Sequence, residues 1–433
     1  MLAQYVNVRQ FGAKGDGLSD DTKALSNAVR YAKANKKALS FPKGIYLVNN
    51  IDISVNFTGV ENQTQIKKIN KTGRDDIYTF CNIKNRKNII IKNLIFDGSV
   101  KGTATKPKSG SIPLFIYNAS NVSIINCSFI NSPAAGLRVE ISNNINISQC
   151  KTEHLTGAFG DGVYIENSRD IAINNVTSKN YTRIGFVIEK NTRNVKINNC
   201  IASYGHDASI LYGGTEFNAG FWAESSANVQ INNCLSQNNS HYGFVLTSGI
   251  DKRLLNTDLA TFSISKSKSI NNPTAFRVSS SGNPVNINII QCQAVAANQG
   301  FVAFARDKKD KFTFKGCIAE IRESSKESVN DAGFMWESAI NTPNDYPVFI
   351  YQDCITNFKG ETLVNKLYNK ATNDADLSTY SGGNANIFID GMSNNTPSKK
   401  PVIKAIKGNP KIEITNTSPN LNYMNRKDQV IIK

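Results

Sequence analysis

The chain has 433 residues, of which 40% are hydrophobic, so it can bury a large core. No apolar run approaches the length of a membrane-spanning helix, which argues against membrane insertion. The formal charge is +16, but the basic residues are scattered over turns such as 84–87 and 306–311, without a recognisable nucleic-acid module. The charge therefore indicates a solvated basic surface or an anionic polysaccharide partner, and no nucleic acid is expected.

The first 50 residues predict a strand, a helix and a strand. A Gly-Asp-Gly turn leads to Asp20 and Asp21, which are typical of a helix start. Apolar residues then follow at helical spacing, namely Ala24, Leu25, Ala28, Val29 and Ala32. A stacked β-structure exposes unpaired strand edges at its ends, so we expect residues 1–50 to form an N-terminal cap. The opening MLAQYVNV lacks the features of a signal peptide.

Further along, a phrase that ends in cysteine or valine recurs. It reads NVSIINC, NINISQC, DIAINNV, NVKINNC, NVQINNC, NINIIQC and KFTFKGC, and its first four ends, at 127, 150, 176 and 200, lie 23, 26 and 24 residues apart. This period is typical of a stacked repeat and leaves room for short strands but not for a helical crossover. The phrase predicts one coil of a parallel β-helix per repeat, over residues 51–357.

A second phrase keeps step with the first and opens on glycine: GLRVE, GVYIE, GFVIE and GFWAE, between residues 136 and 224. Alternation with period two predicts a buried face made of Leu137, Val139, Val163, Ile165, Phe186, Ile188, Phe221 and Ala223. The opposite face then carries Arg138, Tyr164, Val187 and Trp222 beside Glu140, Glu166, Glu189 and Glu224. In later repeats the glutamate is replaced by Thr247, Ser279 and Phe304 before it returns as Glu337.

Six of the eight cysteines occupy the same place in the first phrase, and Cys354 closes a similar one. Thiols that repeat in register behave as small hydrophobic side chains, so we expect an inward-facing column of reduced cysteines. Neither disulfides nor a metal site of the C-x-x-C type is supported by the spacing. Beyond Cys354 the rhythm fades, and residues 358–433 are predicted to form C-terminal strands that cap the helix or mediate oligomerisation.

The glutamates of the second phrase are the main catalytic candidates. Carboxylates one coil apart would lie about 5 Å from each other, and two coils apart about 10 Å, separations that suit retaining and inverting glycosidases respectively. Crowded carboxylates cannot all stay ionised cheaply, so one becomes available as a general acid. We expect Glu166, Glu189 and Glu224 to supply the acid and the base or nucleophile. The alternative is that outward glutamates simply pair with nearby Lys or Arg, as we expect for Glu140 with Arg138.

Other polar and aromatic residues are weaker candidates. Asp161 lies in the turn before its strand, and the corresponding turns hold Arg183, Asn218 and His241. His206 and Asp207 lie in a long insertion at 205–218, and a second insertion spans 249–261. We expect Asp161, His206 and Asp207 to assist catalysis, and the substrate to contact Tyr164, Trp222, Arg183, His241 and Tyr212. No metal or cofactor is expected, because the three histidines form no recurring pair.

The N-terminal region also carries a family resemblance. FGAKGDGLSDDTKALSNAV followed by ALSFPKGIYLV resembles the N-terminal signature of the pectate-lyase-like superfamily, in the branch that contains polygalacturonase-type glycosidases and bacteriophage tailspikes. The resemblance implies a right-handed, single-stranded parallel β-helix and a polysaccharide substrate. The chain departs from polygalacturonases, because it has FGDG at 159–162, YGHD at 204–207 and no convincing NTD or RIK motif.

Together these features predict a tailspike-like depolymerase that hydrolyses a bacterial capsular polysaccharide or lipopolysaccharide. The predicted assembly is a homotrimer on a virion tail, or otherwise outside the cell. The groove is expected across residues 159–247, with the two insertions as its walls. Two alternatives stay open: a polysaccharide lyase that acts by β-elimination, with Arg183 or His206 as base, and a non-catalytic glycan-binding spike.

Overall fold

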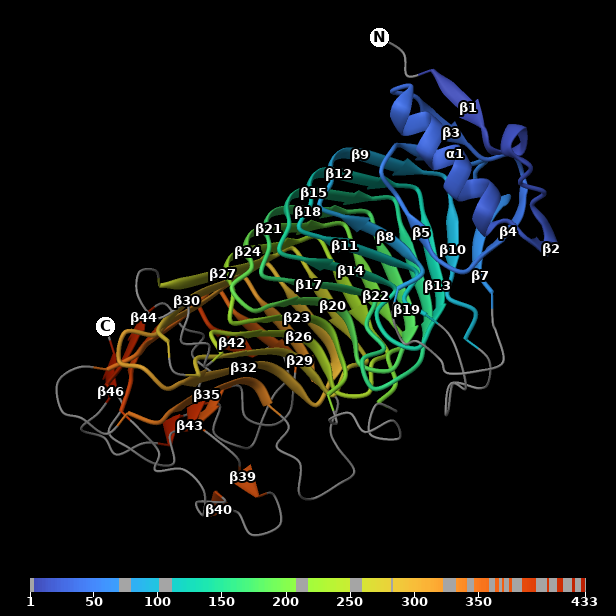
Figure 1. Ribbon diagram of the computed structural model, residues 1–433. Helices are drawn as coiled ribbons and strands as arrows, with labels where there is room; N and C mark the ends of the chain where they lie inside the picture. Colours follow the sequence, from blue (N-terminus) through green and yellow to red (C-terminus); the bar gives the residue numbers. More distant parts are fainter. Residues whose placement is uncertain are drawn as a thin grey trace. The chain divides into compact units, whose positions relative to one another are not determined.

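The computed structural model describes most of the chain up to residue 357 and separate strands beyond it (Figure 1). The described residues are 4–69, 79–100, 111–207, 217–249, 259–281, 283–321, 332–340, 346–357, 363–365, 368–369, 374–375, 384–394, 403–404, 411–415, 423–424 and 430–432. The chain divides into two compact units, residues 1–220 and 221–433. Each unit is a stretch of right-handed parallel β-helix with three sheets, here called A, B and C, as the repeats predict.

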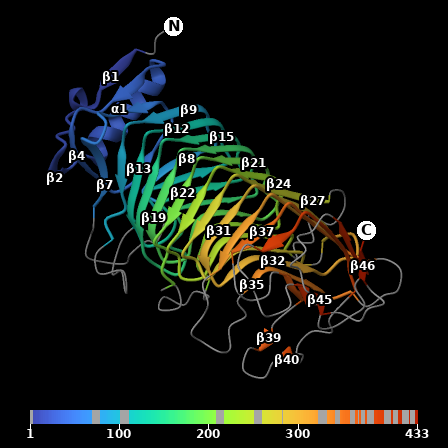
Figure 2. The same ribbon diagram turned by 180° about the vertical axis from the view of Figure 1, so that it is seen from behind.

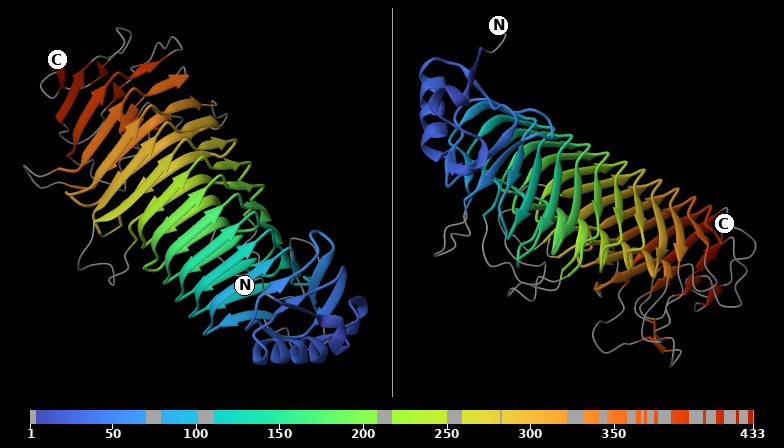
Figure 3. Two further views of the ribbon diagram at one scale, coloured as in Figure 1. Left: turned by 90° about the horizontal axis from the view of Figure 1, so that it is seen from above. Right: turned by 90° about the vertical axis from the view of Figure 1, so that its right-hand side faces the viewer.

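The first unit begins with the short elements of the cap. They are β1 (Tyr5–Asn7), the 3-10 helix η1 (Val8–Phe11), β2 (Asp16–Asp20), α1 (Thr22–Ala34), β3 (Ala38–Ser40) and β4 (Gly44–Val48). Helix α1 lies at the N-terminal end of this unit and buries Leu25, Ala28, Val29 and Ala32, which confirms the predicted helix and its apolar face (Figure 3). The Asp21 carboxylate accepts hydrogen bonds from the Lys14 and Gly15 amides at 2.7 and 3.0 Å, so it ties the helix start to the preceding turn.

In the first unit the strands within each of the three sheets run parallel (Figures 1 and 2). Neighbouring strands are in register, apart from a shift between β2 and β4. Sheet A contains β1, β3, β6 (Phe57–Thr58), β9 (Lys87–Lys92), β12 (Ser120–Ile125), β15 (Asn143–Ser148), β18 (Arg169–Asn174) and β21 (Arg193–Asn198). Sheet B contains β2, β4, β7 (Thr64–Lys68), β10 (Ile95–Asp97), β13 (Ser128–Ser132), β16 (Lys151–Leu155), β19 (Thr177–Tyr181) and β22 (Ile201–Ser203). Sheet C contains β5 (Ile51–Asp52), β8 (Cys81–Lys84), β11 (Leu114–Tyr117), β14 (Leu137–Glu140), β17 (Val163–Glu166) and β20 (Ile184–Glu189). Strand β23 (Ala219–Glu224) spans the boundary of the units.

The second unit has the same three sheets. Sheet A contains β24 (Ala227–Asn232), β27 (Ala260–Ser265), β30 (Val285–Ile290), β33 (Lys311–Lys315), β36 (Val348–Gln352), β41 (Asn386–Asp390), β44 (Lys411–Thr415) and β46 (Val430–Ile432). Sheet B contains β25 (Leu235–Gln237), β28 (Lys268–Ile270), β31 (Gln293–Ala297), β34 (Ile318–Ile321), β37 (Ile355–Asn357) and β42 (Ser393–Asn394). Sheet C contains β26 (Tyr242–Thr247), β29 (Thr274–Ser279), β32 (Gln299–Ala305), β35 (Ala332–Ser338), β38 (Leu363–Asn365), β43 (Ile403–Lys404) and β45 (Tyr423–Met424). The short strands β39 (Tyr368–Asn369) and β40 (Asp374–Ala375) form an antiparallel pair.

Parallel strands therefore continue past residue 357, where β41, β44 and β46 extend the order of sheet A. The three-part division into cap, helix and C-terminal segment stays a prediction. Within the described ranges, no helix has both the length and the apolar composition needed to cross a membrane.

The turn between sheets A and B explains why asparagine recurs at the position before the last residue of the first phrase. Asn126, Gln149, Asn175 and Asn199 have φ between 51° and 56°, the left-handed region that asparagine tolerates better than most residues. The side chains also stack from coil to coil, since Asn126 Nδ2 donates to Asn93 Oδ1 at 2.9 Å. The second asparagine of the ending INNC is thus a turn-forming residue, a role that the sequence analysis did not assign.

Inside each unit the core consists of columns of similar side chains. All eight cysteines are buried and unbridged, which confirms the prediction for the seven of the column and adds Cys81 to the buried thiols. In the second unit the rings of Phe221, Phe244, Phe276, Phe301 and Phe334 form one continuous stack, with neighbouring centroids 4.7–4.9 Å apart. This spacing matches the separation of adjacent strands, so the register of sheet C holds the rings face to face.

Burial of the cysteines leads to a simple chemical prediction. Burial raises the pKa of the Cys150 thiol to about 11, and the other cysteines are equally enclosed by core side chains. We expect a thiol reagent such as DTNB to leave the native protein unlabelled at pH 8 and to label eight thiols per chain in denaturant. Rapid labelling of any thiol in the native protein would contradict the inward column.

Candidate active site

Glu166 and Glu189 lie side by side on the outer face of sheet C in the first unit. The ladder pairs Glu140 with Glu166 and Glu166 with Glu189 on β14, β17 and β20. On the same strands Val163, Ile165, Phe186 and Ile188 point into the core with at most 1% exposure, which confirms the predicted alternation. The two glutamates therefore project outward from adjacent coils, as the second phrase indicates.

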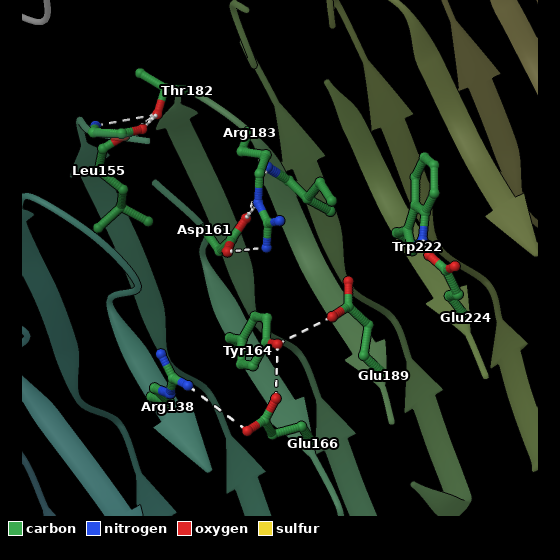
Figure 4. Close-up of polar contacts among 12 residues, drawn as sticks. Arg138, Leu155, Asp161, Tyr164, Glu166, Thr182, Arg183, Glu189, Trp222 and Glu224 are labelled. Atoms are coloured by element: carbon green, nitrogen blue, oxygen red, sulfur yellow. Dashed lines mark hydrogen bonds and ion pairs between the residues drawn. The ribbon is translucent and has the colours of Figure 1, made fainter. Parts of the chain in front are cut away.

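Tyr164 joins the two carboxylates. Its hydroxyl oxygen lies 2.9 Å from Glu166 Oε2 and 3.0 Å from Glu189 Oε2 (Figure 4). Because a single atom contacts both, the two carboxylate oxygens are no farther apart than the sum of these distances, about 6 Å. Burial and the two acidic neighbours raise the pKa of Tyr164, so the phenol keeps its proton at neutral pH.

The exposure expected for Tyr164 is wrong. Its side chain points away from the core, but the residue is only 7% exposed. The guanidinium carbons of Arg138 and Arg183 lie 5.0 and 5.9 Å from the ring centroid and cover it. Period-two alternation gives the side of a sheet on which a residue lies, but not what the neighbouring coils place over it. Tyr164 is thus a bridge between the two acids, not an open platform for a sugar.

Two cations hold Glu166 in its ionised form. Lys190 Nζ forms an ion pair with Glu166 Oε2. Arg138 Nη2 lies 3.7 Å from Glu166 Oε1 (Figure 4). Burial opposes the charge, but the hydrogen bonds from Lys190 and Tyr164 and the positive charges outweigh it and lower the pKa of Glu166. Arg138 also forms an ion pair with Glu140, as expected. Lys190 was missed as a site residue, although it directly follows the phrase GFVIE.

Asp161 and Arg183 form a buried ion pair beside Tyr164. Arg183 Nε and Nη2 donate to the Asp161 oxygens at 2.9 and 2.6 Å, and the Ile184 amide donates to Oδ1 at 3.2 Å (Figure 4). Burial opposes the charge of Arg183, yet the Asp161 carboxylate outweighs this effect and raises the arginine pKa further. Asn218 Nδ2 donates to the Arg183 carbonyl at 2.9 Å, so the turns of three successive repeats are linked in this unit.

The other described candidate residues are His206 and Asp207 on the first insertion, and Trp222, Glu224 and His241 in the second unit. His206 is exposed, and its Nδ1 lies 3.3 Å from the Tyr204 carbonyl oxygen, while Asp207 is half-buried. In the second unit Trp222 Nε1 donates to Glu224 Oε2 at 3.0 Å, and the rings of His241 and Tyr242 are 6.1 Å apart. Tyr212 and most of the two expected groove walls, 205–218 and 249–261, lie outside the described residues.

A hollow on the outer face of sheet C lies in the coils that precede the carboxylate pair. Its volume is about 390 Å³, and it reaches from the first coils to Arg138 and Glu140, next to Glu166. Its lining residues are Asn50, Thr79, Asn82, Lys84, Ile112, Phe115, Arg138 and Glu140. The sequence analysis placed the groove across residues 159–247 and missed this hollow, because CNIK and LFIY in the early coils lack the Gly-x-x-x-Glu pattern.

The described part of the chain brings no three His, Cys, Asp or Glu side chains together in an arrangement that could hold a metal ion. The carboxylates at the site form hydrogen bonds with Tyr164 and ion pairs with Lys190 and Arg138. The chemistry open to them is proton transfer and nucleophilic attack.

A family model described as "Rhamnogalacturonase A/epimerase, pectate lyase-like" matches residues 5–236, more than half of the chain. The chain belongs to this family. The match confirms the resemblance seen in the N-terminal signature, and the matched range includes residues 5–220 of the first unit with its carboxylate pair. Within the rhamnogalacturonase A/epimerase, pectate lyase-like family the fold is thereby fixed, whereas the reaction is not.

Individual relatives add context. The preneck appendage protein of Bacillus phage PZA is 27% identical over 267 residues, which are 54% of this chain and 30% of that protein. The match thus spans less than a third of the appendage protein. The catalytic domain of a GH87 α-1,3-glucanase in complex with nigerose has a TM-score of 0.54 at 12% identity, over 94% of this chain and 68% of that one. The A-module of mannuronan C-5 epimerase AlgE6 from Azotobacter vinelandii has a TM-score of 0.51 at 16% identity, over 97% and 100%. At these identities the two structures show a shared fold alone.

Proposed function

We propose that the chain is a virion-appendage glycoside hydrolase that cleaves a bacterial surface polysaccharide, either capsular or lipopolysaccharide. The observation that carries this proposal is the Tyr164 bridge between Glu166 and Glu189 on the outer face of sheet C. Paired carboxyl groups about 5–5.5 Å apart are the machinery of retaining glycosidases, whereas inverting enzymes need about 6.5–9.5 Å. A separation of about 6 Å or less favours retention of configuration.

The cations beside Glu166 distinguish the roles of the two carboxyl groups. Glu166 is held ionised by Lys190 and Arg138, and it accepts the single proton of the Tyr164 hydroxyl. Glu189, the other carboxyl group on the same tyrosine oxygen, is left for the proton-donating role. Glu189 is therefore the general acid and Glu166 the nucleophile.

The reaction follows from these roles. Glu189 protonates the glycosidic oxygen as its bond to the anomeric carbon breaks, and the Glu166 carboxylate forms an ester with that carbon. Glu189, now ionised, takes a proton from water as the water displaces Glu166. The Lys190 side chain is 47% exposed and covers the far less accessible Glu166, so it has to swing aside when the substrate enters.

The same contacts disfavour Tyr164 and Arg183 as the base of a β-elimination. A lyase needs an unprotonated base that can take a proton from a uronic acid. The Tyr164 pKa is raised by burial and by its two acidic neighbours, and Arg183 is held as a cation by Asp161. Neither group can accept a proton at neutral pH.

A non-catalytic glycan-binding spike is the second candidate. It is favoured by the low exposure of Glu166, 7%, and by its two cationic partners, which are also typical of a purely structural ion network. In that case the face of sheet C would bind sugar without turnover, and charge-neutral substitutions would change affinity alone.

The virion setting is supported by the likeness to the phage PZA appendage protein. We further propose a homotrimer, since the sequence resembles tailspikes. Light scattering at micromolar concentration should return three chain masses of 47.5 kDa each. A single-chain mass would remove the trimer and leave the enzymatic proposal intact.

The experiment that tests the function is incubation with a panel of purified capsular polysaccharides and lipopolysaccharides. A reducing-end assay and absorbance near 235 nm are followed together. New reducing ends without the unsaturated chromophore support hydrolysis, and NMR of the first product should show the retained anomer. Both signals together would point to a lyase, and neither signal across the panel, with binding retained, would leave the glycan-binding spike.

Phe115 is expected to act in substrate binding. Its half-buried ring lies in the hollow of the coils that precede the pair, with Lys84 Nζ 5.5 Å from the ring centroid. Phe115→Ala should raise KM roughly two- to ten-fold and leave kcat near the wild-type value, because the ring does not contact either carboxylate. Phe388→Ala, which removes an exposed ring from β41, is the matched control and should change neither constant. A loss confined to kcat would contradict a binding role for Phe115.

A further inference from the structure

The second unit contains a cavity of its own, on the outer face of sheet C. Its volume is about 350 Å³, and it is formed by β29, β32, β35 and the residues that follow them. The ladder aligns Ser279 with Phe304 and Phe304 with Glu337, which are the positions that carry Glu140, Glu166 and Glu189 in the first unit. The same column of the repeat thus has different chemistry here.

An arginine and an aromatic ring form one wall of this cavity. The Arg277 guanidinium carbon lies 5.1 Å from the Phe304 ring centroid and 5.5 Å from that of Tyr242. Arg277 Nη1 also donates to the Tyr242 hydroxyl at 3.0 Å. These contacts hold the guanidinium plane in one orientation before any ligand arrives, which reduces the entropy lost on binding.

A second arginine, Arg306, has its backbone held in place by hydrogen bonds. The Arg306 amide donates to Ser280 Oγ at 2.7 Å and to Asp310 Oδ2 at 2.9 Å, and both acceptors are buried. The Arg306 side chain is exposed at the rim of the cavity, while Glu337 lines it with 5% exposure. Serine hydroxyls and Gln299 supply further polar groups on the lining.

We infer that this cavity is a second glycan-binding site, without hydrolytic function, that takes an acidic sugar residue. The Arg277 guanidinium matches a sugar carboxylate, Phe304 offers an apolar surface for the ring, and Glu337 with the serines can hydrogen-bond hydroxyl groups. The register places Ser279 and Phe304, not a second carboxylate, in line with Glu337 on β29 and β32. The site goes beyond the proposed hydrolase, since it needs no turnover and lies in the other unit.

The test uses two trisaccharides that differ only at C6: a β-1,4-linked glucuronic acid trimer and cellotriose. Isothermal titration calorimetry in low salt should show that the wild-type protein binds the acidic trimer. The affinity should be lower by about ten-fold or more when Arg277→Gln replaces the wild type, and also when cellotriose replaces the acidic trimer. Lys309→Gln removes an exposed charge just outside the lining and should leave the affinity unchanged. Arg277→Lys, which keeps the charge but loses the planar fork, should bind with intermediate affinity.

Several outcomes would overturn the site. They are no binding of the acidic trimer by the wild-type protein, equal affinity for both trisaccharides, or equal losses for Arg277→Gln and Lys309→Gln. Phe304→Ala gives a second variant in case Arg277→Gln disturbs folding, which circular dichroism would reveal, and it should weaken binding as well. Glu166→Gln/Glu189→Gln should bind the acidic trimer as the wild type does, so failure of this site and failure of the hydrolase are separate results.

Discussion

Glu189→Gln is expected to lower turnover of the susceptible glycan by about two to four orders of magnitude. Glutamine keeps the shape of the side chain and its contact with the Tyr164 oxygen, which lies 3.0 Å away, but it cannot protonate the leaving group. Glu166→Gln should cause a loss of the same order, because an amide cannot form the ester with the anomeric carbon. The rate is measured by reducing-end release under saturating substrate.

The matched control for these variants is Glu153→Gln, which removes a carboxylate from sheet B of the same unit, away from the pair. It should retain wild-type turnover, and circular dichroism should show all three variants folded. Near-wild-type turnover in both Glu166→Gln and Glu189→Gln would refute the assignment. Tyr164→Phe is a useful companion, because removal of the bridge should change the pH profile of kcat while both carboxyl groups remain.

Asp161→Asn is expected to lower the free energy of unfolding by about 3–5 kcal/mol. The substitution removes the carboxylate that offsets the Arg183 charge inside the protein, where the side chains of the pair are only 1% and 13% exposed. The loss is measured by urea denaturation, followed by circular dichroism. Asp161→Asn/Arg183→Gln should recover part of it, because the arginine charge is then gone as well.

The chain contains its own control for this prediction. Arg86 and Asp52 form an ion pair with the same 2.6 Å separation as Arg183 and Asp161, but their side chains are 28% and 54% exposed. Asp52→Asn should therefore cost at most about 1 kcal/mol, because water already solvates both partners. Similar losses for Asp52→Asn and Asp161→Asn would show that burial does not govern the strength of these pairs.

The fold could be predicted from sequence because the same alternation of buried and outward residues recurs in successive repeats. One alternating strand is ambiguous, but GVYIE and GFVIE one coil apart fix the register, and the buried Val163 and Phe186 follow from it. The column of cysteines was predictable for the same reason. The turn asparagines were visible in the phrases as well, yet their left-handed backbone was recognised only in the structure.

The site was predictable as a column of residues but not as a set of contacts. The phrases place Glu166 and Glu189 on adjacent coils, and this holds. Sequence alone does not say that Arg138 and Arg183 cover Tyr164, because that depends on side-chain torsions in three coils. Likewise, the hollow near Phe115 arises from strands that lack the repeated phrase, so the repeat pattern does not predict it.

The phenylalanine stack in the second unit makes each core residue depend on the next coil. Phe244 and Phe276 have centroids 4.8 Å apart, and each also faces another ring on its far side. When both are replaced by leucine, the contact between them is lost once, whereas the two single replacements each lose it. Adjacent replacements therefore cost less free energy together than the sum of the single ones, while distant replacements simply add. Energetically, this core behaves as a one-dimensional chain of coupled neighbours, in which a damaging change is most readily compensated one coil away.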